Sequence, residues 1–173
     1  MKTNMLAFIL SLIFLTSCYA ARIDGPYEGK VVDANTGQPI EGVVVLGTWY
    51  REIVTPGGAT HKFYDAMETV TDKDGEFRIK GLGLLVASNV IPMNVIIFKA
   101  GYEYESGSWS SLKEGLFTEN ITWDGAKAII ALKKLTLEER KKRGTPPFAA
   151  PEERMKLMLK EIYQERREIG LGN

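Results

Sequence analysis

Two runs of strand-forming residues, each broken by a turn, constrain the fold of this chain more than any other feature of its sequence. One run covers residues 29–46 and the other residues 69–79, and both are rich in β-branched and apolar side chains. Turn residues interrupt them, with Asn-Thr-Gly at 35–37 in the first and Asp-Lys-Asp-Gly at 72–75 in the second. Each run therefore predicts a β-hairpin.

Short apolar segments separated by turn residues continue this pattern along the chain. The segment at 40–50 has apolar side chains on both faces, which is typical of a central strand that is covered on both sides. The predicted strands cover residues 27–33, 40–50, 68–72, 76–80, 93–100 and 126–132, with one irregular strand within 103–125. Seven strands and no helical period before Thr136 predict a mainly β fold, a seven-stranded antiparallel sandwich over residues 27–135. Residues 51–66 contain Pro-Gly-Gly and predict a long loop.

The N-terminal segment has the features of an export signal. A positive start is followed by a compact apolar run at residues 5–16, and small residues precede Cys18. A membrane-spanning helix needs about 20 apolar residues, so an uncleaved anchor helix is the less favoured alternative. The Leu-Thr-Ser-Cys sequence that ends at Cys18 resembles the lipobox of bacterial lipoproteins. We therefore expect a signal peptide at residues 1–17 and a tether at residues 18–26.

The lipobox resemblance implies a membrane anchor at Cys18. In such proteins the signal is cut before the cysteine, and the cysteine then carries more than one acyl chain, which gives stable anchoring. Cys18 is the only cysteine of the sequence, so an internal disulfide is not expected. In well-studied envelopes an aspartate after the cysteine retains the lipoprotein at the inner membrane. Because Tyr19 follows here, the resemblance favours export across the inner membrane and anchoring in the outer membrane.

Residues 136–173 change to a helical pattern. Thr136 and Glu139 fit a capping box at the start of a short helix. A second helix is predicted from Pro151 to just before Gly170. Its apolar residues recur at helical spacing and form one stripe of Met155, Met158, Leu159, Ile162 and Ile169. Three interpretations of this tail stay open: packing on the sandwich, binding to a protein partner in the envelope, and binding to a membrane, which the mixed charges weaken.

Motifs of the predicted sandwich resemble the carboxypeptidase regulatory-like domain. They are Gly29-x-Val31-x-Asp33, Thr36-Gly37-x-Pro39-Ile40-x-Gly42-Val43-x-Val45, Thr71-Asp72-x-Asp74-Gly75-x-Phe77-x-Ile79 and Phe98-Lys99-Ala100-Gly101-Tyr102. The resemblance covers residues 27–135 and implies a transthyretin-like, seven-stranded sandwich that serves as an accessory folding or binding module. The tail also resembles helical segments that follow this domain in uncharacterised bacterial envelope proteins. The insertion at 51–66 departs from the family pattern.

The inventory of reactive side chains argues against an enzyme. Lys plus Arg and Asp plus Glu number 22 each, so the chain lacks the excess basic charge on which non-specific nucleic-acid binding depends. His61 is the only histidine, which excludes a multi-histidine metal site, and an acylated Cys18 cannot serve as a nucleophile. The spacing around Gly75 does not fit a calcium loop, and we expect a tight turn there instead. No catalytic residue, metal, cofactor or nucleic-acid partner is therefore expected.

Four aromatic residues are the candidate binding residues: Tyr102, Tyr104, Trp109 and Trp123. Such rings stack on glycans, although they more often cap the end of a sandwich core, where we expect Trp123 and leave Trp109 open. The sequence favours a non-catalytic envelope lipoprotein that binds or scaffolds another envelope component. It would contact the membrane through the lipid on Cys18 and a protein partner through the C-terminal helix. The alternative is a glycan-binding or peptidoglycan-binding module that uses the aromatic segment from Tyr102 to Trp123.

Overall fold

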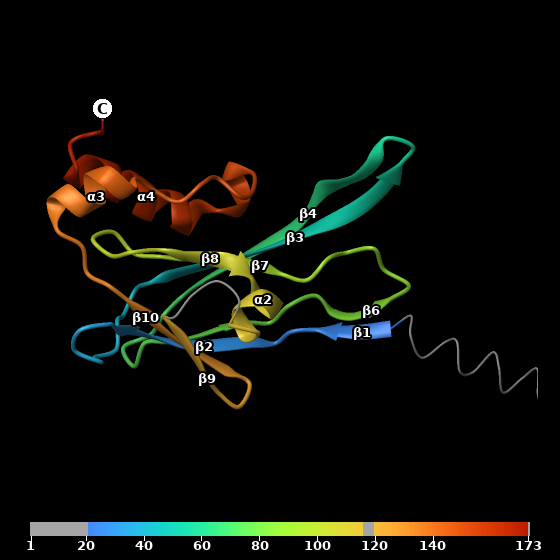
Figure 1. Cartoon of the computed structure of the whole chain (residues 1–173), viewed down its shortest axis with the longest axis horizontal. Helices are drawn as coiled ribbons and strands as arrows, with labels where there is room; N and C mark the ends of the chain where they lie inside the picture. The colour runs from blue at the N-terminus through green and yellow to red at the C-terminus, as the bar shows by residue number, and fades with distance from the viewer. Residues whose placement is uncertain (1–20, 116–119, 173) are drawn as a thin grey trace, which may run out of the picture.

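The fold is a β-sandwich with helices on one outer face (Figure 1). The computed structural model describes residues 21–115 and 120–172, so Cys18 and the predicted signal peptide lie outside the described residues. The strands are β1 Ala21–Asp24, β2 Tyr27–Asp33, β3 Val44–Thr55, β4 Gly58–Val70, β5 Glu76–Ile79, β6 Gly83–Val86, β7 Asn94–Phe98, β8 Glu105–Ser108, β9 Ile121–Asp124 and β10 Lys127–Leu132. The helices are α2 Trp109–Lys113, α3 Leu137–Arg143, the 3₁₀ turn η1 Glu152–Arg154 and α4 Lys156–Glu168.

Two four-stranded sheets form the sandwich. The β2 sheet has the order β5-β2-β10-β9, the β3 sheet has the order β4-β3-β7-β8, and β1 pairs with β6 in a separate ribbon. The predicted mainly β architecture is confirmed, but the prediction of an antiparallel arrangement throughout is wrong, because β10 pairs with β2 in parallel. The hairpin of β9 and β10 joins the β2 sheet only after the chain has passed through the β3 sheet. Turn residues predict hairpins between consecutive strands, whereas this pairing joins strands far apart in the sequence.

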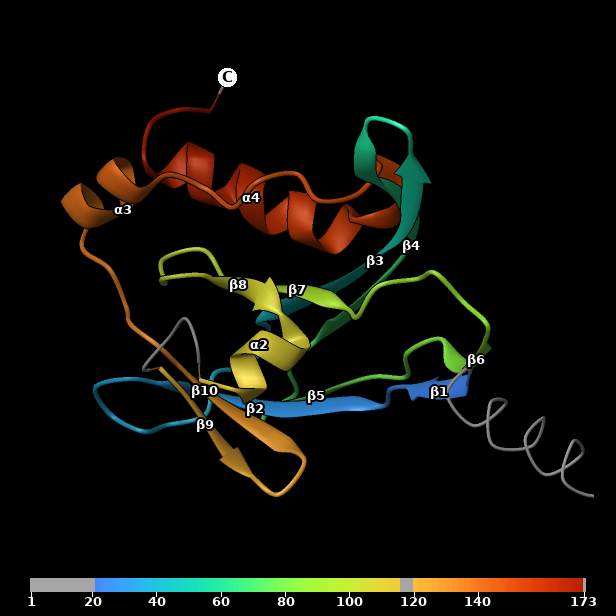
Figure 2. The ribbon, with the colours of Figure 1, turned by 45° about the vertical axis from the view of Figure 1, so that its right-hand side comes forward.

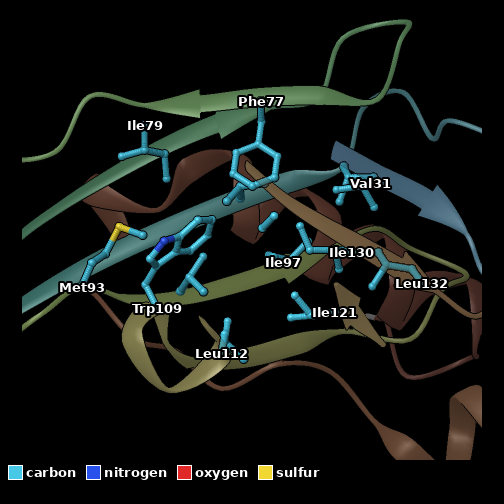
Figure 3. Close-up of a cluster of buried hydrophobic side chains, with 14 of the residues drawn as sticks. Val31, Phe77, Ile79, Met93, Ile97, Trp109, Leu112, Ile121, Ile130 and Leu132 are labelled. Atoms are coloured by element: carbon cyan, nitrogen blue, oxygen red, sulfur yellow. The ribbon is translucent and has the colours of Figure 1, made fainter. Parts of the chain in front are cut away.

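The core between the sheets is built from the central strands, as alternation predicts. Trp49 and Val45 point inward, while Val44 and Leu46 of the same strand point outward, and all four are buried. β7 divides its side chains in the same way, with Val95 and Ile97 inside and Ile96 and Phe98 outside. Figure 3 shows side chains from both sheets and from α2 converging on the inner cluster. The prediction that the segment at 40–50 is covered on both faces is confirmed.

The segment at 51–66 is a β-hairpin, so its prediction as a loop is wrong. β3 and β4 pair continuously to Thr55 and Gly58, with a single irregularity between Trp49 and Tyr50. Pro56 and Gly57 supply the turn. The outer part of the hairpin is exposed on both faces and so lacks apolar alternation, which is why the sequence pattern did not reveal it.

The segment at 103–125 contains more structure than the one irregular strand predicted. It holds β8, β9 and, between them, the short helix α2, which contradicts the absence of helix before Thr136. α2 has only five residues, of which Trp109 and Leu112 are buried. One helical turn is too short to establish a detectable period in the sequence.

The turn before β5 forms as predicted, but the two predicted hairpins are wrong, because β2 and β3 lie in different sheets and so do β4 and β5. The Asp72 carboxylate accepts hydrogen bonds from the backbone N–H groups of Asp74 and Glu76, both at 2.9 Å. Gly75 has a φ of 74°, and a Cβ there would lie 2.5 Å from the carbonyl oxygen of Val31. Within residues 21–115 and 120–172 there is no cluster of three or more potential metal ligands. The carboxylate at Asp72 therefore stabilises a turn of the chain itself.

The tail packs on the outer face of the β3 sheet (Figure 2). The capping box between Thr136 and Glu139 is present at the start of α3, as predicted. α4 begins later than predicted, because Pro151 precedes the 3₁₀ turn and Met155 occupies the N-cap. The predicted apolar stripe is buried, and four of its members, Met155, Met158, Leu159 and Ile162, contact the sheet cluster. In the described part of the chain, every helix is too short or too polar to cross a membrane.

Candidate functional site

β1 belongs to the fold, which corrects the prediction of a tether over the described residues 21–26. β1 pairs with β6 from Ala21 opposite Val86 to Asp24 opposite Gly83, just as β2 pairs with β5 in the sandwich. The chain therefore extends the β2–β5 pair beyond the sandwich as a second two-stranded segment, the β1–β6 ribbon, at one end of the molecule (Figures 1 and 2). This end is the candidate functional site, because Cys18 precedes β1 by three residues.

Two glycines join the β1–β6 ribbon to the sandwich. Gly25 and Gly81 both have positive φ angles, 85° and 73°. A Cβ on Gly25 would lie 2.5 Å from the carbonyl oxygen of Lys80, and a Cβ on Gly81 would lie 2.3 Å from that of Asp24. Side chains cannot occupy such positions, so the two connections approach each other backbone to backbone. Gly25, which falls within the predicted tether, instead belongs to this close contact.

Asp24 is the centre of the site. Its carboxylate is buried and accepts four hydrogen bonds. Oδ2 accepts from Trp49 Nε1 at 2.9 Å and from the backbone N–H of Leu82 at 3.0 Å, while Oδ1 accepts from the Tyr27 hydroxyl at 2.7 Å and from Arg22 Nη1 at 3.3 Å. A buried carboxylate is stable only when its charge and lone pairs are satisfied in this way. Asp24 thus links β1 to β2, β3 and the start of β6.

The environment of Asp24 changes the pKa of Tyr27 and fixes the position of Arg22. Burial, together with the hydrogen bond to Asp24, raises the pKa of the Tyr27 phenol well above its ordinary value. Arg22 also donates from Nη2 to the carbonyl oxygen of Val90 at 2.6 Å, and Val90 is bridged to Arg51 of β3. The hairpin of β3 and β4, the segment before β7 and β1 are therefore one connected unit.

The side of the β1–β6 ribbon that faces away from Trp49 is apolar. Ile23 and Leu84 are opposite each other on this side, and Ala21 is opposite Val86. The side chains of Ile23, Leu84 and Val86 are 77%, 68% and 64% exposed. These residues form a small exposed apolar patch on the ribbon.

The four predicted aromatic residues do not form one binding platform. Trp109 is 8% exposed and packs edge-on against Trp123 at 5.4 Å between ring centroids, and Trp123 Nε1 donates to the carbonyl oxygen of Leu112. Trp123 thus lies against the core, as expected, and Trp109 is part of it. Tyr104 lies on the other side of the β3 sheet, where it packs on Phe98. Tyr102 is partly buried against the inner cluster.

The tail is attached by polar contacts as well as by its apolar stripe. The Glu68 carboxylate of β4 accepts hydrogen bonds from the backbone N–H groups of Leu157 at 3.0 Å and Met158 at 2.7 Å, so the sheet caps the N-terminus of α4. At the other end of α4, Glu165 is 2% exposed and accepts from the Gly101 backbone N–H at 2.8 Å and from Arg140 Nη2 at 2.6 Å. The packing interpretation of the tail is thereby confirmed.

A polar groove runs between the edges of the two sheets. It has a volume of about 460 Å³ and lies where β4 and β5 end their respective sheets. Its lining includes both signs of charge: Glu28, Thr69, Val70, Asp72, Glu76, Phe77, Arg78 and Lys127. Arg78 pairs with Glu28 at 3.0 Å, and Lys127 pairs with Glu76. An open, charged groove of this kind suits contact with a polar macromolecule rather than enclosure of a small apolar ligand.

Sequence reasoning missed Asp24, the residue with the most side-chain partners at the site. It lies in Ile-Asp-Gly-Pro, where an aspartate normally indicates an exposed turn. Its donors come from residues up to 58 positions away, so no local signal marks it as buried. His61, in contrast, is exposed, and it lies on β4.

Comparisons with protein-family models, with curated proteins and with solved structures found no match to this chain.

Proposed function

We propose that this protein is a lipid-anchored envelope protein whose sandwich is a non-catalytic module that contacts another envelope component. The observation that carries the proposal is the attachment of β1 to the sandwich core through the buried Asp24. If Cys18 is acylated, its Cα is three residues from Ala21 and so at most about 11 Å away. Because β1 begins three residues after Cys18 and is joined to the core, the anchor would hold the domain close to the membrane surface.

The acylation itself is supported by the lipobox resemblance at Cys18. The chain after the cysteine leaves only Tyr19 and Ala20 before β1 begins. A protein that is held this closely presents its surfaces at a fixed height to neighbours in the same envelope. An outer-membrane location remains part of the proposal, on the basis of Tyr19.

The groove between β4 and β5 is the surface that best fits a partner. The outer face of the β3 sheet is occupied by the tail, and the inner faces of both sheets form the core. The groove instead combines charged side chains with the outer edges of β4 and β5, each of which pairs on one side only. Free strand edges accept extended segments of other proteins through backbone hydrogen bonds. A partner that binds through the tail would have to use its outward face, which includes Tyr163, since the apolar stripe is buried.

The finer family assignment is also part of this proposal. We infer a transthyretin-like sandwich of the carboxypeptidase regulatory-like type from the sequence motifs. The positions of the motifs support it, because they fall on β2, on the connection that leads into β3, on β5 with the turn before it, and at the end of β7. The glycan-binding alternative receives no such support, because the ring of Trp109 is buried and the four aromatic residues lie on different surfaces.

The first test asks whether Cys18 is acylated. The full chain is expressed in a bacterium with its own signal, and the mass of the mature N-terminal peptide is measured. We expect a mass that corresponds to an acylated Cys18, and we expect Cys18→Ser to move the protein from the membrane fraction to the soluble fraction. An unmodified cysteine in membrane-associated protein would refute the anchor.

The second test locates the partner surface by cross-linking in native envelopes. Removing the tail is unsuitable because it would uncover the apolar face of the β3 sheet. We therefore compare Arg78→Glu in the groove with Tyr163→Ser on the outer side of α4, and use Lys142→Glu on α3 as a control for charge reversal at an exposed site. Loss of the cross-linked species with Arg78→Glu alone supports the groove. Loss with Tyr163→Ser alone would assign the contact to the tail, and equal cross-linking in all three would exclude both surfaces.

A further inference from the structure

The outer side of the ribbon formed by β1, β2, β5 and β6 changes character along its length. In the part that belongs to the sandwich, Glu28 is opposite Arg78 and Lys30 is opposite Glu76, so this side is entirely charged. Beyond Gly25 and Gly81 the same side carries Ala21, Ile23, Leu84 and Val86. Solubility in water does not require this change from charged to apolar side chains, because charged side chains keep an exposed ribbon soluble. The apolar part therefore marks a separate contact.

This apolar face is not covered by the described chain. Its large members are all more than 60% exposed, although the opposite side of the same ribbon is packed through Asp24 and Leu85 against the core. Of the twelve large hydrophobic side chains exposed in the described residues, seven lie on β1, β6 or the hairpin of β3 and β4, and all of these except Val70 are away from the inner end of β4. Both structures project at the same end of the molecule (Figures 1 and 2). Exposed apolar side chains are thus concentrated where the chain comes from Cys18.

We infer that the apolar face of the β1–β6 ribbon, formed by Ala21, Ile23, Leu84 and Val86, rests in the headgroup and acyl boundary of a phospholipid bilayer. The inference depends on the proposed acylation of Cys18. Since only two residues separate Cys18 from β1, the lipid on the cysteine brings this face within about 11 Å of the bilayer. Apolar side chains at that position are removed from water by entering the boundary, as in interfacial helices that lie on a membrane.

A charge at the margin of the face agrees with this occupant. Lys80 is exposed at the point where the charged part of the ribbon meets the apolar part, whereas Arg22 lies on the opposite side and is paired with Asp24. Cations beside an inserted apolar surface lie at the level of the lipid phosphates and attract anionic headgroups. The acyl chains supply attachment, and the ribbon supplies orientation. α3 and the end of α4, which lie at the opposite end of the molecule, then point away from the bilayer (Figures 1 and 2).

The test measures how deeply chosen side chains enter the lipid. Once Cys18 is acylated, an introduced cysteine is the only free thiol of the full chain and can carry an environment-sensitive fluorophore. The probe is placed by Leu84→Cys, with Val86→Cys as a second position on the same face in case the first variant folds poorly. Leu171→Cys is the matched control, since Leu171 is similarly exposed, at 61%, and follows α4, whose end is paired with α3 through Arg140 and Glu168. Labelled, acylated proteins are reconstituted into phosphatidylglycerol and phosphatidylethanolamine vesicles that contain nitroxide-labelled lipid.

The expected result is a blue-shifted emission at positions 84 and 86 and quenching by the nitroxide lipids several-fold stronger than at position 171. Acylated protein with equally weak quenching at all three positions overturns the inference and leaves the anchor intact. A blue shift at 84 and 86 without lipid quenching would show that a second copy of the protein covers the face, which also overturns it. If the mass of the mature peptide shows no acyl group on Cys18, the proposed function fails and this inference fails with it.

Discussion

Two apolar sheet surfaces lie outside the core of this protein, and one is covered by a helix while the other is exposed. The outer face of the β3 sheet, with Val44, Leu46, Ile96 and Phe98, is covered by α4 of the same chain. The outer face of the β1–β6 ribbon, with Ile23, Leu84 and Val86, has no cover among the described residues. The covered face lies far from the start of the described chain, whereas the bare face includes β1, with which the described chain begins (Figure 1). The chain thus covers one of its two outer apolar faces with its own helix and leaves the other exposed among the described residues.

The two faces also differ in how they are fixed. Polar contacts hold the tail in place over its face, from Glu68 of β4 to the start of α4 and from Glu165 of α4 to the Gly101 backbone. The ribbon is instead fixed from behind, by the carboxylate of Asp24, so its apolar side is presented outward in a defined orientation. Substitutions that loosen one attachment should therefore leave the other unchanged.

The largest effect is expected from Asp24→Ala. The change leaves Trp49 Nε1 and the Leu82 N–H without an acceptor in a buried site and removes the partner of Arg22. We expect the free energy of unfolding to fall by about 3–5 kcal/mol. Urea unfolding followed by tryptophan fluorescence measures it. Asp124→Ala, at an exposed aspartate of β9, is the control and should stay within about 0.5 kcal/mol of the wild type. Equal values for the two variants would show that Asp24 does not fix the ribbon.

A pair of identical substitutions compares the two faces directly. Ile162→Ala removes a fully buried side chain between α4 and the β3 sheet, and should cost about 2–4 kcal/mol of unfolding free energy. Ile23→Ala removes the same atoms from a side chain that is 77% exposed, and should cost no more than about 1 kcal/mol in the absence of lipid. Thermal or urea unfolding of both variants in water provides the measurement. A large loss with Ile23→Ala would mean that the ribbon face is covered in the free protein.

The attachment of the tail should weaken in Glu68→Ala. The helix α4 then loses the carboxylate that caps its N-terminus, because the side chain of Met155 at the N-cap makes no hydrogen bond. We expect a loss of about 1–2 kcal/mol and a decrease of helical circular dichroism before the sheets unfold. Glu153→Ala, at an exposed glutamate of the preceding 3₁₀ turn, serves as the matched control. Equal unfolding free energies of these two variants would show that Glu68 does not hold the tail.

The smallest effect that we expect is a change in the pH dependence of the melting temperature. Burial and the bond to Asp24 raise the pKa of Tyr27 in the folded protein, whereas a tyrosine of the unfolded chain ionises near about pH 10. The folded state therefore holds this proton more tightly, so the contribution of Tyr27 is complete below pH 10 and decreases as the pH rises further. Melting temperatures measured from pH 8 to about 11.5 should fall less steeply in Tyr27→Phe than in the wild type. Tyr163→Phe, at a more exposed phenol, should follow the wild-type profile.

The sequence by itself determined those parts of the structure that depend on neighbouring residues. Alternation along residues 40–50 predicted apolar side chains on two covered faces of one strand, and Trp49 and Leu46 are indeed buried on opposite faces. The capping box of Thr136 and the turn at Asp72 followed from contacts within four residues. Local side-chain chemistry is sufficient for such features because every partner is already close in the chain.

The tertiary structure alone decided the features that join distant residues. The parallel pairing of β10 with β2, the cap that Glu68 places on a helix 89 residues away, and the burial of Asp24 leave no local pattern. The same holds for the apolar face at the anchor end, since Ile23 and Leu84 become neighbours only when β1 pairs with β6. Side chains acquire partners of this kind only after the sheets have formed, because the partners are set by packing and not by spacing along the chain.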